Sequence, residues 1–304
     1  MIEAFGLLLP IFVVIAIGRA AVQLRLIDPA GVRGINEFTV RIAFPALLFA
    51  SITNGAVPQV FGVAGVYLAG CLAVYGLALL LARVALGTSL AQGAAFALNA
   101  TYGSAAYIAL PVVSATFGAA GLSQIVPIIA LHSGVLLPLA GFLIEIGSQG
   151  TNRAVLRHTA QSLIRNPIVM SLIIAFVWNA GGVPVPPPLR ALLNLLGAAA
   201  PSLALFCVGA SLPVIAGGYA KEAMLATTLK LGVLPITIGA LSIFAGLSGL
   251  PLKVALVTAA MPTGANAFLV ARRAAAFTET SAQIVVISLI VSLPILSGLL
   301  MELR

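Results

Sequence analysis

The sequence predicts an all-α polytopic membrane protein with ten transmembrane helices, arranged as two inverted five-helix repeats in which helices 4 and 9 are broken and cross. Three observations lead to this fold class: a very apolar composition, ten apolar stretches of membrane-spanning length, and prolines that recur halfway along the chain. Of the 304 residues, 61% are hydrophobic and 7% are charged, and the mean hydropathy is +1.18. Soluble domains carry about 25% charged residues, so this chain lacks the polar surface of a water-soluble protein.

Ten stretches are long and apolar enough to cross a membrane, since a spanning helix needs about 20 mostly apolar residues. We number them spans 1 to 10. They cover residues 4–24, 33–53, 59–86, 91–117, 122–146, 166–182, 189–215, 222–247, 253–275 and 279–302.

Lysine and arginine residues at the span ends predict the orientation, because short cytoplasmic loops carry an excess of them. With the N-terminus outside, ten of the 15 lie at cytoplasmic ends and three at outer ends, while Arg41 and Lys230 lie within spans. We therefore expect both termini to be non-cytoplasmic.

Five prolines of the first half recur 155 to 157 residues later, which indicates an internal repeat. The pairs are Pro10 with Pro167, Pro29 with Pro184 or Pro186, Pro45 with Pro201, Pro58 with Pro213, and Pro138 with Pro294. We therefore divide the chain into repeats 1–150 and 151–304. Each repeat holds five spans, an odd number, so the second starts on the opposite side of the membrane, as in many secondary transporters. The alternative is a coincidence of proline spacing in proline-rich membrane helices.

Spans 4 and 9 each contain a helix-breaking sequence near the middle. In span 4 the break lies at Gly103 and Ser104, and in span 9 it lies at Pro262 and Thr263. Glycine weakens a helix and proline removes a backbone donor, and unpaired backbone groups at membrane depth are tolerated only where protein or a wet cavity satisfies them. Two crossing breaks would supply such groups to a small anion. The polar neighbours that we expect there are Tyr107, Asn266, Asn99 and Thr101. The alternative is a pair of packing kinks without a ligand.

Three ionisable residues lie well inside spans, away from the span ends, where charge is costly and usually functional. Lys230 lies about nine residues into span 8, roughly 14 Å deep at 1.5 Å per residue, and we expect it to supply positive charge to an anion site. Arg41 lies about as deep in span 2, where snorkelling to the interface is the competing interpretation. His132, near the middle of span 5, could carry a proton or be a structural, hydrogen-bonded histidine.

Other classes of protein find little support in the sequence. The basic residues are scattered, which argues against a nucleic-acid partner. With two histidines, no metal-ligand motif, no phosphate loop and no nucleophile elbow, we expect neither an enzyme nor a metal or other cofactor. No Asp or Glu lies at a midplane, so coupling to H+ or Na+, if present, would not use an intramembrane carboxylate.

Several segments resemble the auxin efflux carrier family. They are Arg41–Phe49 (RIAFPALLF), the Asn166-Pro167-Ile168 start of span 6, and residues 260–271 (AMPTGANAFLVA), the last being most similar to the bacterial malonate-transporter type. This resemblance implies a scaffold of spans 1, 2, 6 and 7, a mobile transport bundle of spans 3–5 and 8–10, and a homodimer in the bacterial plasma membrane. It also implies elevator-type movement of small organic anions. The family often has Asn after the span 4 break, where this chain has Ser104, so the substrate can differ.

The sequence thus predicts a secondary active transporter of small, malonate-like carboxylates, with the anion and the lipid bilayer as its partners. One alternative is a carrier of aromatic weak acids such as auxin-like compounds. Another is a membrane sensor or scaffold that binds a ligand without moving it.

Overall fold

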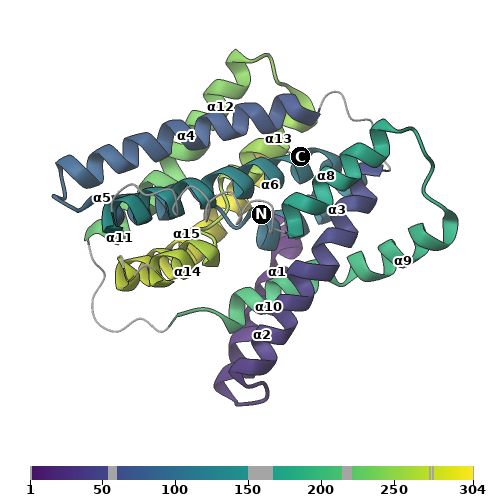
Figure 1. Ribbon diagram of the computed structural model, residues 1–304, viewed down its shortest axis with the longest axis horizontal. Helices are drawn as coiled ribbons and strands as arrows, with labels where there is room; N and C mark the ends of the chain where they lie inside the picture. The colour runs from purple at the N-terminus through teal and green to yellow at the C-terminus, as the bar shows by residue number, and fades with distance from the viewer. Residues whose placement is uncertain are drawn as a thin grey trace.

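The computed structural model describes residues 2–53, 60–149, 167–213, 221–273, 275 and 277–303, and their regular structure is helical (Figure 1). The first half contains α1 (Ile2–Gln23), α2 (Pro29–Phe38), α3 (Phe44–Thr53), α4 (Val60–Val84), α5 (Leu90–Thr101) and α6 (Leu110–Gln149). The second half contains α8 (Pro167–Ala180), α9 (Pro187–Ala198), α10 (Ala200–Ala210), α11 (Lys221–Thr228), α12 (Leu234–Phe244), α13 (Gly249–Ala259), α14 (Ala265–Arg273) and α15 (Thr278–Leu303). Pro58, Arg153, Arg157, Arg165 and Asn166, which entered the sequence predictions, lie outside the described residues.

Six helical segments among the described residues are long and apolar enough to cross a membrane. They are Pro29–Thr53, Gly62–Val84, Ala105–Ser148, Pro187–Ala210, Lys221–Phe244 and Thr278–Leu303, with shorter apolar helices at Leu9–Gln23, Pro167–Ala180 and Gly249–Ala259. Large apolar side chains also face outward, including Phe244 at 91% exposure. An apolar outer surface suits lipid and not water. The prediction of an all-helical, multi-pass membrane protein is confirmed.

Local sequence explains where several helices begin and bend. Asp28 caps α2, since its carboxylate accepts a 2.7 Å hydrogen bond from the Gly31 N–H. Ser89 and Gln92 form a capping box at the start of α5. Gly118 has φ +60°, a conformation that favours glycine, and it kinks α6 between the segments predicted as spans 4 and 5.

Three single π-helical turns interrupt the helices, each two residues before a proline. They are η1 (Thr39–Ala43) before Pro45, η2 (Ala105–Ala109) before Pro111, and η3 (Leu229–Val233) before Pro235. A proline ring clashes with the carbonyl four residues earlier and leaves it without its usual donor. A wider turn at that place relieves the clash, which explains why the π-turns recur there.

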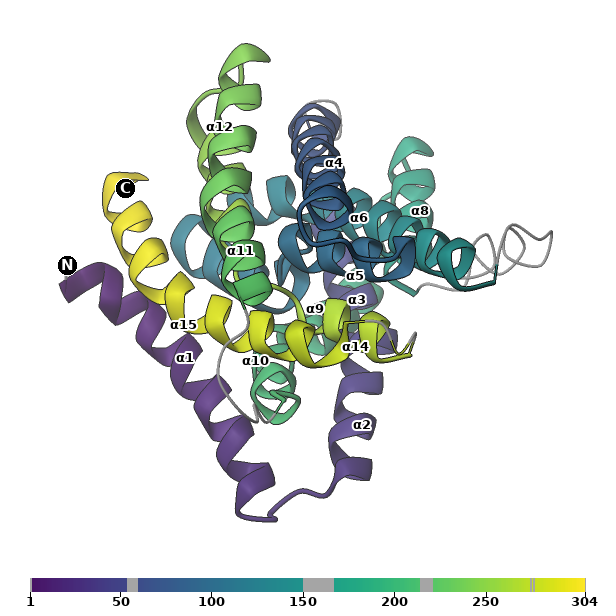
Figure 2. The ribbon, with the colours of Figure 1, turned by 90° about the vertical axis from the view of Figure 1, so that its left-hand side faces the viewer.

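The helices pack in two groups. In the first, α1 packs on α10, and α3 packs on α8 and α9. Gly18 and Gly209 allow the α1–α10 contact, because a Cβ at Gly209 would overlap the Ile15 carbonyl oxygen and one at Gly18 would overlap the Phe206 carbonyl oxygen. In the second group, α4 packs on α5, α6 and α12, and α15 packs on α11 and α14. Figure 2 shows α11 and α12 stacked end to end beside α4, with α1 and α2 forming a V that closes at the bottom of the view.

Candidate functional site

Two helices are interrupted at the positions that the sequence predicts, and the interruptions pair with each other. The first lies between the end of α5 at Thr101 and η2, and the second lies between α13 and α14. Gly103 and Thr263 form an antiparallel β-bridge. The Ser104 N–H donates to the Pro262 carbonyl at 2.9 Å, and the Gly264 N–H donates to the Tyr102 carbonyl at 2.9 Å. Backbone groups that leave one helix are therefore satisfied by the other.

Side chains satisfy further backbone groups of the two breaks. The Gly103 N–H donates to His132 Nε2 at 3.3 Å, and the Thr263 N–H donates to Ser288 Oγ at 3.0 Å. The Thr263 hydroxyl donates to the Asn99 carbonyl at 2.9 Å, which ties the end of α5 to the second break. Non-helical backbone inside a membrane protein needs hydrogen-bond partners of this kind.

His132 contacts the first break through the Gly103 N–H and is fully buried. Its ring stacks on that of Tyr102, with centroids 4.5 Å apart, and meets the Tyr67 ring edge-on. Because Nε2 accepts a hydrogen bond from Gly103, that nitrogen carries no proton and the ring is neutral in this arrangement. His132 thus bonds the backbone of the first break and packs against two tyrosine rings.

Lys230, in η3, also lies against the first break. Its side chain has no exposed surface, and its Nζ donates to the Ala259 carbonyl at 2.7 Å. A Cβ added at Gly103 would lie 3.3 Å from both Cε and Nζ of Lys230, a tight contact, so Lys230 packs directly against the first break.

The side chains of Asn99 and Thr101 bond within the protein and are not in the lining of the polar cavity described below. Asn99 Nδ2 donates to the Ala95 carbonyl at 2.8 Å, and the Thr101 hydroxyl donates to the Ala97 carbonyl at 2.7 Å, so both bond their own helix. Asn99 Oδ1 accepts a 2.7 Å hydrogen bond from Ser281. Asn99 therefore links α5 to α15, whereas Thr101 bonds only within α5.

A polar cavity of about 860 Å³ opens beside the paired breaks. Three of the predicted residues line it: Arg41, Tyr107 and Asn266. The predicted residues Gly103, Ser104, Pro262 and Thr263 form the breaks and do not line it. The full lining is Asn36, Glu37, Val40, Arg41, Tyr102, Ala106, Tyr107, Ser133, Leu137, Pro167, Ile168, Asn266 and Leu269.

The first turns of two helices that start at the breaks face this cavity. Ala106 and Tyr107 belong to η2, and Asn266 belongs to α14. The N-terminal end of a helix carries partial positive charge and attracts anions. The Arg41 guanidinium adds a full positive charge to the lining. The Glu37 carboxylate lines the same cavity and offsets the charge of Arg41, so the positive potential comes from the two helix starts, beside amide and hydroxyl groups.

Four polar residues of the lining were not predicted from the sequence: Asn36, Glu37, Tyr102 and Ser133. The Tyr107 hydroxyl donates to Asn36 Oδ1 at 3.0 Å, and the hydroxyls of Tyr102 and Ser133 lie 3.1 Å apart. Helical spacing could have indicated Asn36 and Glu37, since residues 36, 37 and 40 share one face of a helix with Arg41. Glu37 brings a carboxylate to the cavity lining, although its place near the start of span 2 did not indicate this.

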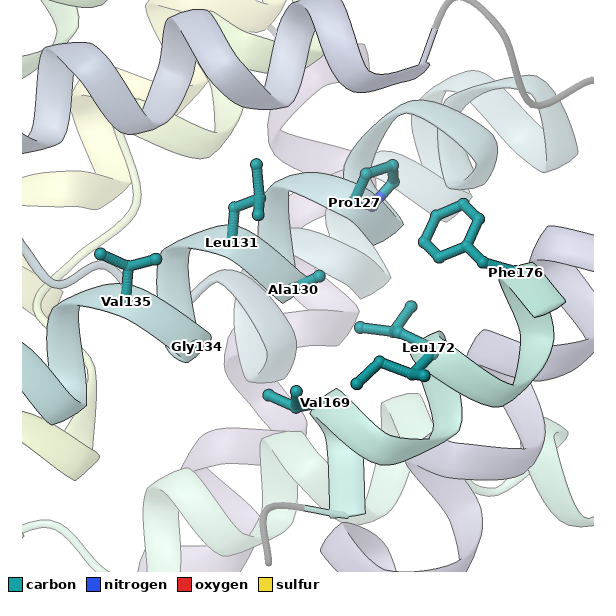
Figure 3. Close-up of a pocket in the computed structure, with 9 residues that line it drawn as sticks. Pro127, Ala130, Leu131, Gly134, Val135, Val169, Leu172 and Phe176 are labelled. Carbon is teal, nitrogen blue, oxygen red and sulfur yellow. The ribbon is translucent and has the colours of Figure 1, made fainter. Parts of the chain in front are cut away.

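Two other cavities lie elsewhere among the described residues. One, of about 220 Å³, is apolar and lies between α6 and α8, where Ala130 and Pro127 face Leu172 and Phe176 (Figure 3). The other, of about 600 Å³, is lined by ends of α1, α10, α14 and α15 and includes Arg19, Arg272 and Glu279. Neither touches the paired breaks. Among the described residues, no group of three His, Cys, Asp or Glu could hold a metal ion.

A multi-pass helical protein with two paired helix breaks beside a polar cavity has the build of a membrane transporter. The chain belongs to the family described as "Membrane transport protein", the auxin efflux carrier family, whose profile matches residues 3–300. Its members are membrane transporters and not enzymes.

Curated relatives agree with this assignment. "Uncharacterized transporter YfdV" of Escherichia coli (strain K12) is 23% identical over 94% of this chain and 93% of its own length. "Putative malonate transporter" of Rhizobium meliloti (strain 1021) is 24% identical over 100% of this chain and 97% of its own length. "Auxin efflux carrier component 2" of Oryza sativa subsp. japonica is 29% identical over 47% of this chain and 24% of its own length.

Proposed function

We propose that this membrane transporter is a secondary active carrier of small organic anions with malonate-like carboxylates, working by elevator-type alternating access. The observation that carries the proposal is the polar cavity, into which Ala106, Tyr107 and Asn266 bring the first turns of two half-helices. Helix N-termini facing one cavity suit a carboxylate, because partial positive charge meets the anion without a metal ion. Asn266 and Tyr107 offer hydrogen bonds, while the charge of Arg41 is offset by that of Glu37 in the same lining.

The packing supports ten spans in two inverted repeats, 1–150 and 151–304. In such repeats span 1 is equivalent to span 6, and span 2 is equivalent to span 7. The contact between α1 and α10, in spans 1 and 7, then corresponds to the contact between α3 and α8, in spans 2 and 6. In the same way, the α4–α5 contact corresponds to the α12–α13 contact. A breaking sequence in each repeat, at span 4 and span 9, fits the same symmetry.

The same packing supports a division into a scaffold and a moving bundle. Spans 1, 2, 6 and 7 form the scaffold, spans 3–5 and 8–10 form the bundle, and the cavity has walls from both: Asn36 and Arg41 from span 2, and Ser133 and Asn266 from the bundle. Sliding of the bundle past the scaffold would carry an anion bound at the breaks across the membrane. We further propose that two copies associate through the scaffold as a homodimer.

The orientation rule supports an inward-facing conformation. With both termini outside, α2 and α8 begin on the cytoplasmic side, and α14 runs from its break toward the cytoplasm. All three contribute lining residues, so the cavity faces the cytoplasm under this orientation.

Aromatic weak acids are a second candidate substrate class, because Tyr102 and Tyr107 line the cavity and part of the chain is similar to a rice protein named as an auxin efflux carrier component. The test is uptake of labelled carboxylates into proteoliposomes that contain the purified protein. The panel is acetate, malonate, succinate, benzoate and indole-3-acetate, with proton and sodium gradients imposed separately.

We expect malonate-sized dicarboxylates to be taken up fastest. Faster uptake of indole-3-acetate would favour the aromatic alternative. Binding of a carboxylate without uptake of any of them would indicate a sensor and contradict a carrier.

A further inference from the structure

Lys230 is a buried cation whose position the apolar packing does not explain. It lies in η3, at the middle of the α11–α12 stack that Figure 2 shows beside α4. Its side chain is fully buried, yet its Nζ reaches the Ala259 carbonyl at 2.7 Å. Ala259 is the last residue of α13, the half-helix that ends at the second break. The ammonium therefore lies at the carbonyl end of a helix, where the dipole favours a positive charge.

The groups around Lys230 leave this charge without a carboxylate partner in the described part of the chain. From α4, Cys71 and Tyr67 lie nearby, and both are fully buried. From α6, His132 approaches, and as a hydrogen-bond acceptor it is neutral. From the first break, Gly103 lies against Cε and Nζ. A buried ammonium without an anionic side chain is costly unless another negative group approaches.

The two breaks thus have different groups on their two sides. On one side lies the cavity, lined by Tyr102 and the first turns of η2 and α14. On the other side lies Lys230, whose Cε and Nζ are 3.3 Å from the position that a Cβ of Gly103 would occupy. Tyr102 lines the cavity and its neighbour Gly103 lies against Lys230, so an anion bound beside the first break would be attracted by a positive charge that is covalently attached to the protein.

We propose that Lys230 is the resident cation of the paired breaks: its tethered ammonium supplies the positive charge against which an anion binds, in place of a dissolved metal cation. The proposal rests on the proposed function in one respect, namely that the ligand is an anion. It has two consequences. Binding and transport of the anion do not require Na+, and a neutral side chain at position 230 weakens both the paired breaks and the anion site.

The decisive variant is Lys230→Ala, because the atoms it removes beyond Cβ have the size of n-propylammonium. That cation can be added back in solution, and 1-propanol is a neutral molecule of similar shape. The matched control is Lys221→Ala, which removes the same charge from an exposed residue at the start of α11. Thermal unfolding of the full-length protein in detergent is measured for each variant, with n-propylammonium chloride, 1-propanol or choline chloride added.

We expect Lys230→Ala to unfold at a lower temperature than Lys221→Ala, and n-propylammonium to recover part of the loss while 1-propanol and choline do not. Equal unfolding temperatures for the two variants, or equal recovery with 1-propanol, would overturn the proposal, since only shape would then matter. If Lys230→Ala cannot be purified, Lys230→Arg and Lys230→Met replace it. A folded Arg variant beside an unfolded or less stable Met variant supports the resident cation, and equal behaviour of the two contradicts it.

The link to the anion is measured separately, as uptake of labelled malonate by proteoliposomes. For the wild-type protein we expect less than a twofold change when Na+ is replaced by choline, and at least a tenfold loss of uptake in Lys230→Ala but not in Lys221→Ala. A tenfold requirement for Na+ in the wild type contradicts the resident cation. Absence of wild-type uptake for every carboxylate contradicts the proposed function instead, while the unfolding experiment still decides the role of Lys230.

Discussion

Gly264 provides a sharp test of the paired breaks, because it has the least room for a side chain where the two segments meet. A Cβ there would lie 3.0 Å from Cδ1 and Cε1 of Tyr102 and 3.3 Å from the Gly103 carbonyl oxygen. The Tyr102 ring cannot easily withdraw, since it stacks on His132 and its hydroxyl lies 3.1 Å from Ser133 Oγ. Extra atoms in a packed interior typically cost about 1–3 kcal/mol. We therefore expect Gly264→Ala to lower the unfolding temperature by roughly 2–12 °C, at about 2–4 °C per kcal/mol.

The matched control is Gly141→Ala in α6, where no atom lies within 4 Å of the added Cβ. Alanine is favoured over glycine inside a helix by about 0.5–1 kcal/mol, so this variant should be at least as stable as the wild type. Both variants are compared by thermal unfolding in detergent and by carboxylate uptake in proteoliposomes. If Gly264→Ala unfolds at or above the temperature of Gly141→Ala, the close contact between the breaks is wrong.

Three further substitutions test the cavity and the packing. Asn266→Ala removes the amide from the first turn of α14 and should lower carboxylate uptake about tenfold with little change in unfolding temperature; unchanged uptake would remove Asn266 from the site. Tyr107→Phe removes the 3.0 Å bond to Asn36, and since such bonds in membrane proteins average about 0.6 kcal/mol, we expect about a threefold change in KM for uptake. An unchanged KM would show that this bond does not shape the cavity. Gly209→Val would overlap the Ile15 carbonyl oxygen and should separate α1 from α10, seen as loss of folded protein on size-exclusion chromatography; a normal yield would contradict the close helix contact.

The two breaks could be predicted from the sequence because they depend on local chemistry. Glycine and proline weaken a helix locally, and the spacing of Gly103 and Pro262 near the repeat distance suggested that the two interruptions meet. That Lys230 lies within a helical span could also be predicted, since counting residues along the sequence places it well away from the span ends. The hydrogen-bond partner of Lys230 could not be predicted, because the bond from Nζ to the Ala259 carbonyl depends on how α13 lies against η3.

The lining of the cavity was harder to predict, because it depends on which helix faces are brought together. Asn99 and Thr101 flank the break in sequence, yet they bond the carbonyls of Ala95 and Ala97, as polar residues inside membrane helices often do. Glu37 lies near the end of a span in sequence, and only the packing of α2 against the bundle shows that it faces the same cavity as Asn266.

The most direct test of an anion site in the polar cavity is substrate protection of a cysteine placed in its wall. Ala106 lines the cavity in η2, and Ala106→Cys is made in a chain whose buried Cys71 and Cys207 are replaced by Ala. Ala210→Cys, in the wall of the cavity that contains Arg19, is the matched control. The rate of labelling by a water-soluble thiol reagent is measured with and without the carboxylate that is taken up fastest. We predict at least tenfold slower labelling of Ala106→Cys and no change for Ala210→Cys, whereas equal labelling of Ala106→Cys with and without that carboxylate would contradict an anion site in this cavity.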